Sequence, residues 1–137
     1  MSRAVARWIL AIALGAIGVL HFRSTRGFRV VVPDWATRLT RLDKDAIVVA
    51  SGAAEVALAA GLIALPRERR RMGWATAAFF VAVFPGNVHQ WRTRRSTPGL
   101  DTDGRRLGRL FLQPLLVGWA LWATDDRGPR SRAPRGR

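Results

Sequence analysis

Residues 46–65 read AIVVASGAAEVALAAGLIAL, an apolar run in which Glu55 is the one ionisable side chain. A helix rises about 1.5 Å per residue, so about 20 apolar residues span a hydrocarbon core about 30 Å thick. This stretch therefore predicts a transmembrane helix with Glu55 near its middle. An ionised carboxylate at that depth costs at least about 2.5 kcal/mol, so we expect Glu55 to be paired, protonated or functional.

Three further apolar runs are close to the first in length: AVARWILAIALGAIGVLHF (4–22), MGWATAAFFVAVFPGNVHQW (72–91) and LGRLFLQPLLVGWALWA (107–123). Four buried helices of this length would leave too little chain to cover them in a soluble protein. We therefore predict an all-α fold in which four transmembrane helices form an up-down-up-down bundle. The bundle occupies residues 4–123, with connections at 23–45, 66–71 and 92–106. We expect the basic tail, residues 124–137, to be disordered and cytoplasmic.

The first run also has features of a cleaved signal peptide, because Arg3 and Arg7 lie at its start. It is, however, long, and it ends in His21-Phe22-Arg23 rather than in the small residues of a cleavage site. A retained helix is the preferred interpretation, and cleavage remains the alternative.

The composition is strongly basic, with 23 Lys and Arg residues against 9 Asp and Glu residues and a net charge of +14. Such an excess is typical of proteins that contact nucleic acid or an anionic membrane surface. Here the arginines flank the apolar runs, which favours anionic lipid headgroups as partners and argues against nucleic acid. The chain has no cysteine, which excludes disulfides, a thiol nucleophile and a cysteine zinc site, and we predict no metal site.

The basic side chains divide almost evenly between the two sides of the predicted membrane. The short connection PRERRR (66–71) is the densest basic segment, and short loops weigh most in the positive-inside rule. This places both termini in the cytoplasm.

Small residues recur at every fourth position in three of the runs, a pattern that lets helix backbones approach closely within a membrane. They are Ala11 and Gly15; Ala53, Ala57 and Gly61; and Ala78, Ala82 and Gly86. We expect these faces to be the contacts between helices.

Each predicted helix places a polar side chain in the same half of the membrane. Glu55 lies about 14 Å from that face, Gln113 about 9 Å and Asn87 about 6 Å, with His21 at a helix end. Arg109, one turn before Gln113, is placed to reach Glu55 and keep it charged. We predict a ligand-binding pocket from these five residues, with Glu55 as the candidate proton carrier and no other catalytic assignment. In the alternative interpretation His21 is an interfacial histidine, while Asn87 and Gln113 only join helices.

Five short motifs follow one another along the runs: GVLHF (18–22), VVPDW (31–35), SGAAE (51–55), VFPGN (83–87) and RLFLQ (109–113). In this order they resemble the DoxX-like family of small bacterial integral membrane proteins, which is related to the MauE group. The resemblance covers about residues 4–123. This sequence differs in having Phe111 where a proline is common before the glutamine, with Pro114 just after it.

The resemblance implies a multi-pass protein of the bacterial cytoplasmic membrane. Relatives include a subunit associated with thiosulfate:quinone oxidoreduction, and others act in redox-enzyme maturation or oxidative-stress complexes. It therefore favours a non-catalytic subunit or assembly partner of a membrane redox or oxidative-stress complex, and not an enzyme on its own.

The alternative from a different class is a small lipophilic molecule, such as a quinone, bound around Glu55. The chain would then be a binding protein or a quinone-linked oxidoreductase component, although the sequence requires no cofactor. A protein partner and a homo-oligomer are both compatible with the pattern. Transport ranks last, because four helices leave little room for a path without a homo-oligomer.

Overall fold

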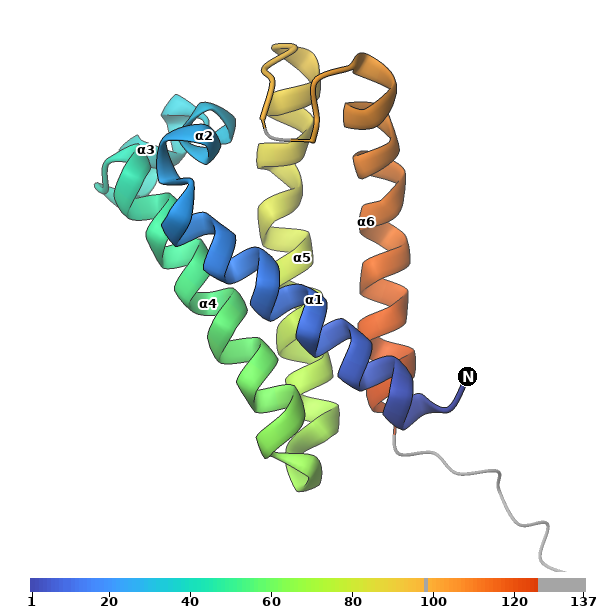
Figure 1. The fold of residues 1–137 in the computed structure, drawn as a ribbon. Helices are drawn as coiled ribbons and strands as arrows, with labels where there is room; N and C mark the ends of the chain where they lie inside the picture. The colour runs from blue at the N-terminus through green and yellow to red at the C-terminus, as the bar shows by residue number, and fades with distance from the viewer. Residues whose placement is uncertain (98, 126–137) are drawn as a thin grey trace, which may run out of the picture.

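The computed structural model describes residues 1–97 and 99–125, and in this part the chain is helical apart from its connections (Figure 1). Its elements are α1 (Arg3–Arg23), α2 (Thr25–Phe28), η1 (Arg29–Val31), α3 (Asp34–Thr40), α4 (Lys44–Ala64), η2 (Pro66–Glu68), α5 (Arg69–Arg92) and α6 (Asp103–Thr124). The predicted all-α class is confirmed. The tail was predicted to begin at residue 124, but Thr124 is the last residue of α6, and residues 126–137 of the predicted disordered tail lie outside the described residues.

The four long helices alternate in direction, and each covers one of the four predicted apolar runs (Figure 1). The main helix pairs are α1 with α4 and α5 with α6. The N-terminus and the turn between α4 and α5 lie at one end of the bundle. The other end carries the loop between α5 and α6 and the cap segment (residues 25–40), which contains α2, η1 and α3.

Short polar side chains begin three of the long helices slightly before the apolar runs themselves. Ser2 accepts a hydrogen bond from the backbone N–H of Val5, and Asp43 accepts one from Ala46. Thr102 does the same at the start of α6. Each cap satisfies one of the amides that a helix start leaves without a partner, so the helices include the flanking charged residues.

Helices α1 and α4 approach each other closely where Gly18 of α1 meets Gly52 of α4. A Cβ added to Gly18 would lie 2.8 Å from the carbonyl oxygen of Gly52, and the reverse substitution would meet the Gly18 oxygen at the same distance. Absence of a side chain at both positions therefore permits this crossing.

The predicted small-residue faces are only partly used. Ala11 is buried, and a Cβ on Gly15 would touch Ala59, so the face on α1 does pack. On α4 and α5 the alanines of the predicted faces are exposed, namely Ala53, Ala57, Ala78 and Ala82. Gly61 of the α4 face is buried, and a Cβ added there would meet the side chain of Met72 on α5. A four-residue spacing marks a stripe on a helix but does not say which of several stripes meets a neighbour.

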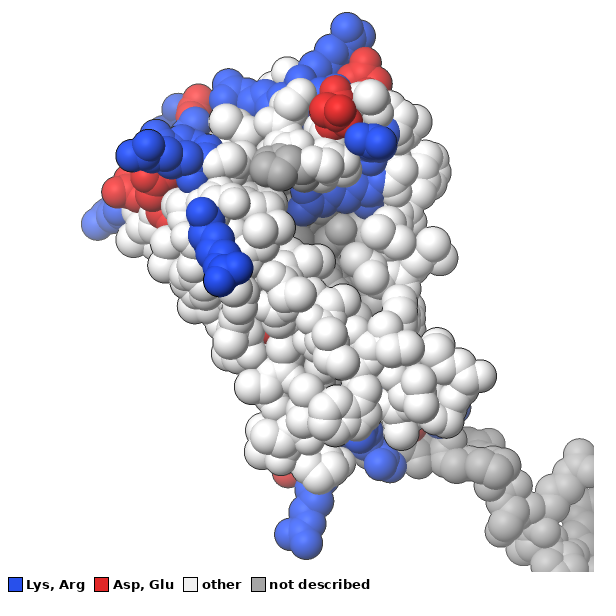
Figure 2. All heavy atoms as spheres, in the orientation of Figure 1, with Lys and Arg blue, Asp and Glu red and all other residues white. Residues whose placement is uncertain are grey.

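Two helices, α1 and α4, are each long and apolar enough to cross a membrane. Large apolar side chains are also exposed on α5 and α6, including Trp74, Val81, Phe111 and Leu115. Figure 2 shows charged side chains gathered toward the two ends of this face, with a band almost free of charge between them. The sides of the bundle thus present hydrocarbon to their surroundings.

Candidate functional site

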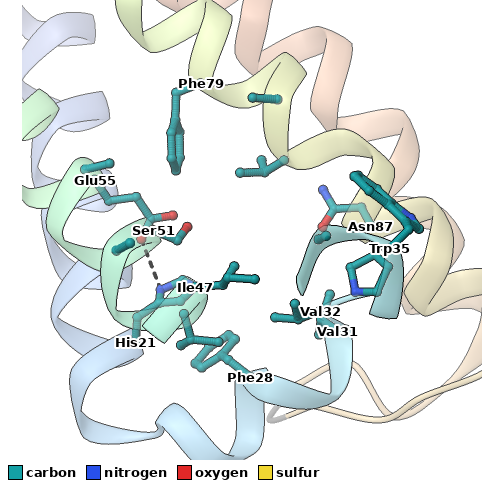
Figure 3. Close-up of a pocket in the computed structure, with 18 of the residues that line it drawn as sticks. His21, Phe28, Val31, Val32, Trp35, Ile47, Ser51, Glu55, Phe79 and Asn87 are labelled. Carbon is teal, nitrogen blue, oxygen red and sulfur yellow. Dashed lines mark ion pairs between the residues drawn. The ribbon is translucent and has the colours of Figure 1, made fainter. Parts of the chain in front are cut away.

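A cavity of about 340 Å³ lies between α4, α5 and the cap segment (Figure 3). Phe28, Val32 and Trp35 of the cap segment form an apolar wall. Small residues line the two long helices: Ala50, Ala54, Ala82 and Gly86. These short side chains leave the space between α4 and α5 unfilled, and two of them, Ala82 and Gly86, were predicted to pack helices together but line the cavity.

Glu55 and His21 form the polar wall of this cavity. Oε2 of Glu55 lies 3.0 Å from Nδ1 of His21, and the two side chains are only 9% and 10% exposed (Figure 3, dashed line). The same Nδ1 lies 2.9 Å from the carbonyl oxygen of Ile17. A carbonyl can only accept, so Nδ1 carries the proton and its N–H is directed to Ile17.

This geometry leaves the Glu55 carboxylate incompletely satisfied. Its buried Oε2 receives no well-directed hydrogen bond from the described residues, because the Nδ1 proton of His21, whose nitrogen lies 3.0 Å away, is directed to Ile17. A buried acceptor without a donor is costly, and a hydroxyl or N–H on a bound molecule would relieve that cost.

The ring of His21 is fixed from a second side by the cap segment. It stacks on Phe28 with ring centroids 4.3 Å apart and an interplanar angle of 19°. Phe28 packs in turn against Val32 and Val48, so folding of the cap segment holds the imidazole against Glu55. Of the two interpretations of His21, the structure favours a site residue over an interfacial histidine.

Asn87 and Gln113 form a buried bridge between α5 and α6. The amide nitrogen of Asn87 donates to Oε1 of Gln113 at 3.0 Å, and Nε2 of Gln113 donates to the carbonyl oxygen of Phe80 at 2.6 Å. Asn87 also lines the cavity, whereas Gln113 lies behind it as a positioning residue.

Arg109 lines the cavity but forms no ion pair with Glu55 in the described part of the chain. Its guanidinium instead donates to Oε1 of Gln90 at 3.4 Å. The sequence-based expectation that Arg109 pairs with Glu55 is therefore wrong, because the cavity separates them and His21 takes that place. Arg109 therefore provides hydrogen-bond donors on a different wall of the cavity from Glu55.

A second buried arginine, Arg106, shapes the loop above α5 and α6. It donates to the backbone oxygens of Arg95 and Asp101 and to the side chains of Ser96 and Asp103. This role of Arg106 was not predicted from the sequence, because an arginine near the start of a helix is usually a solvent-exposed charge. A hydrogen bond to its own backbone and the nearby Arg105 lower the pKa of Asp101, which keeps this carboxylate charged beside the arginines.

Two ion pairs tie the cap segment to the start of α4. Lys44 lies 2.7 Å from Asp34, and Arg29 lies 3.0 Å from Asp45. The hydrogen bond and charge of Lys44 lower the pKa of the Asp34 carboxyl, so this pair stays charged at neutral pH. Both pairs are partly exposed and serve mainly to orient the cap segment over the cavity.

Four of the five predicted site residues line this one cavity, namely His21, Glu55, Asn87 and Arg109, with Gln113 bonded to Asn87 behind it. Sequence reasoning missed the wall formed by Phe28, Val32 and Trp35, although the quoted VVPDW stretch was the available signal. In the described residues, His, Asp and Glu form no group of three or more that could hold a metal ion.

Comparison with known proteins gives one match. A family model described as a domain of unknown function (DUF8561) matches residues 10–124. No curated protein and no solved structure matches the chain. The matched range includes every residue that lines the cavity, so the family model covers the whole candidate site.

Proposed function

The chain belongs to the DUF8561 family, and from its cavity we propose that it is a four-span protein of the bacterial cytoplasmic membrane that binds a small lipophilic molecule. The observation that carries the proposal is the unsatisfied, buried carboxylate oxygen of Glu55 in an otherwise apolar cavity. Such a cavity with few convergent polar groups is typical of small-molecule sites.

The membrane placement is supported by surface chemistry on all four long helices. Helices α1 and α4 are long and apolar enough to cross a membrane. On α6, Phe111 and Leu115 are 69% and 68% exposed, and on α5 Trp74 is 59% exposed. Soluble monomers rarely expose such continuous apolar surface. The arginine-rich ends would meet headgroups, and the resemblance to the DoxX-like family supports the same placement.

Single cysteines distinguish four spans from two, because the natural chain has no cysteine to give a background. We replace Leu39, Thr93 or Arg67 by cysteine and label spheroplasts with a membrane-impermeant maleimide. With four spans and cytoplasmic termini, positions 39 and 93 react at once and position 67 only after permeabilisation. If only α1 and α4 crossed, position 93 would instead be protected together with position 67. Labelling of position 67 alone would show the opposite orientation, with both termini outside the cytoplasm.

The ligand that fits best is a quinone-like ring. Apolar and aromatic walls suit its body, and Glu55 can accept a hydrogen bond from a ring hydroxyl at one edge. Arg109 and the amide of Asn87 offer partners for a second oxygen on another wall. In this proposal Glu55 takes up or gives the proton, and His21 holds it in position.

Native mass spectrometry of protein gently extracted from its own membrane tests the proposal directly. We expect a bound lipophilic molecule in substoichiometric or full occupancy, identified by its released mass and its optical spectrum. Protein that is always empty, even after incubation with quinones, would contradict the binding role. A stoichiometric partner protein on an empty chain would instead support the subunit or assembly role that the DoxX-like resemblance implies.

A further inference from the structure

A second hollow lies at the opposite end of the bundle from the candidate site. It consists of two adjoining cavities of about 380 and 440 Å³, which share Arg70 and Trp74 at the start of α5. The first opens between α5 and the end of α6 at Gly118 and Trp122, and the second reaches Arg67 in the η2 turn. We call this hollow, defined by these five residues, the headgroup cleft.

An exposed apolar stripe on α6 begins at the cleft. Gly118 has no side chain to fill the space, and a Cβ added there would meet nothing within 4 Å. Phe111, Leu115, Gly118 and Trp122 follow at spacings of four, three and four residues, so they share one face of the helix. The three large members of this stripe are exposed, which offers a surface for a hydrocarbon chain.

The basic groups of the cleft are not neutralised by the protein. Arg67 and Arg70 form no ion pair or side-chain hydrogen bond within residues 1–97 and 99–125. Nearby acids are already engaged, since Glu68 lies 2.8 Å from Arg71 and Asp125 lies 4.0 Å from Arg3. Two guanidinium groups are therefore available to an anion, and their planar donors match a phosphate group.

We infer that the headgroup cleft binds an anionic phospholipid of the phosphatidylglycerol class. Arg67 and Arg70 hold the phosphate, while Trp74 and Trp122 lie at headgroup depth, where indole rings are favoured. The acyl chains follow the apolar stripe of α6. A free phosphate would meet the same arginines but would leave the tryptophans and the stripe unused, so the lipid is the occupant that explains all three features.

The test uses the full chain in nanodiscs of equal parts phosphatidylglycerol and phosphatidylcholine, followed by native mass spectrometry of the lipids retained. We expect about tenfold enrichment of phosphatidylglycerol on the natural protein. The Arg67→Gln/Arg70→Gln variant should lose this enrichment. The Arg26→Gln/Arg38→Gln variant, with the same loss of charge at the cap end, should keep it.

Two results would overturn the inference: equal retention of both lipids by the natural protein, or enrichment that survives in Arg67→Gln/Arg70→Gln. Displacement of phosphatidylglycerol by equimolar inorganic phosphate would also overturn it, since the site would then be one for free phosphate. The inference rests on the proposed membrane placement, and quinone binding measured on the same variants separates the two ideas. If the Arg67→Gln/Arg70→Gln variant loses lipid selectivity but binds quinone as the natural protein does, the result concerns the headgroup cleft and not the quinone site.

Discussion

Gly18→Ala is expected to lower the free energy of unfolding in detergent by about 2–3 kcal/mol, the upper range for an overpacked contact. The added methyl carbon would lie 2.8 Å from the carbonyl oxygen of Gly52, and backbone cannot move aside as a flexible side chain can. Helices α1 and α4 must separate to admit it. Thermal or denaturant unfolding followed by circular dichroism measures the change.

Gly108→Ala is the matched control. Its added Cβ would meet nothing within 4 Å, so the usual gain of about 1 kcal/mol from replacing a helical glycine should appear as a small stabilisation. If Gly18→Ala were as stable as the natural protein while Gly108→Ala behaved as expected, the close α1–α4 crossing would be incorrect.

Glu55→Leu should reduce quinone binding, measured with the reduced form whose ring hydroxyl can donate to the carboxylate, by about 10- to 100-fold, which corresponds to a lost hydrogen bond to a charged group of about 1.5–3 kcal/mol. Leucine keeps the approximate size of the side chain but removes the acceptor that faces the cavity. Glu55→Gln keeps one acceptor oxygen and should retain part of the affinity. Titration of a fluorescent or radiolabelled quinone into purified protein gives the dissociation constants.

Glu68→Gln is the control, since Glu68 is the other glutamate of the chain and lies at the opposite end of the bundle. It should bind quinone like the natural protein. A Glu55→Leu protein that elutes normally and binds quinone unchanged would show that Glu55 does not recognise the ligand. The cavity would then need another occupant.

The long helices could be predicted from the sequence because each apolar run is as long as a bilayer is thick. Their ends could not be placed as well, since Asp43 and Thr102 act through hydrogen bonds that hydropathy does not register. The connection at 23–45 was treated only as a loop. It holds three short helical elements, because Phe28 and Val32 find an apolar partner in Val48 that is visible only in three dimensions.

The candidate site, too, could be predicted from the sequence only in part. Depth along each helix was enough to place His21, Glu55, Asn87 and Gln113 in the same half of the bundle, since helix rise is a fixed quantity. The spacing of residues along the sequence does not tell how each helix is rotated about its own axis, and therefore which side chains face one another. For that reason the pairing of Arg109 with Glu55 was wrong, and the small-residue faces of α4 and α5 were assigned to packing.

The glycine crossing also has an evolutionary consequence. Gly18 precedes His21 by three residues, and Gly52 precedes Glu55 by three residues, so each glycine lies one helical turn from a member of the acid–imidazole contact. A Cβ added to Gly52 would also lie 2.8 Å from Cβ of His21. A single substitution at either glycine would therefore disturb the α1–α4 crossing and the Glu55–His21 contact in one event, so these two features are constrained together during evolution.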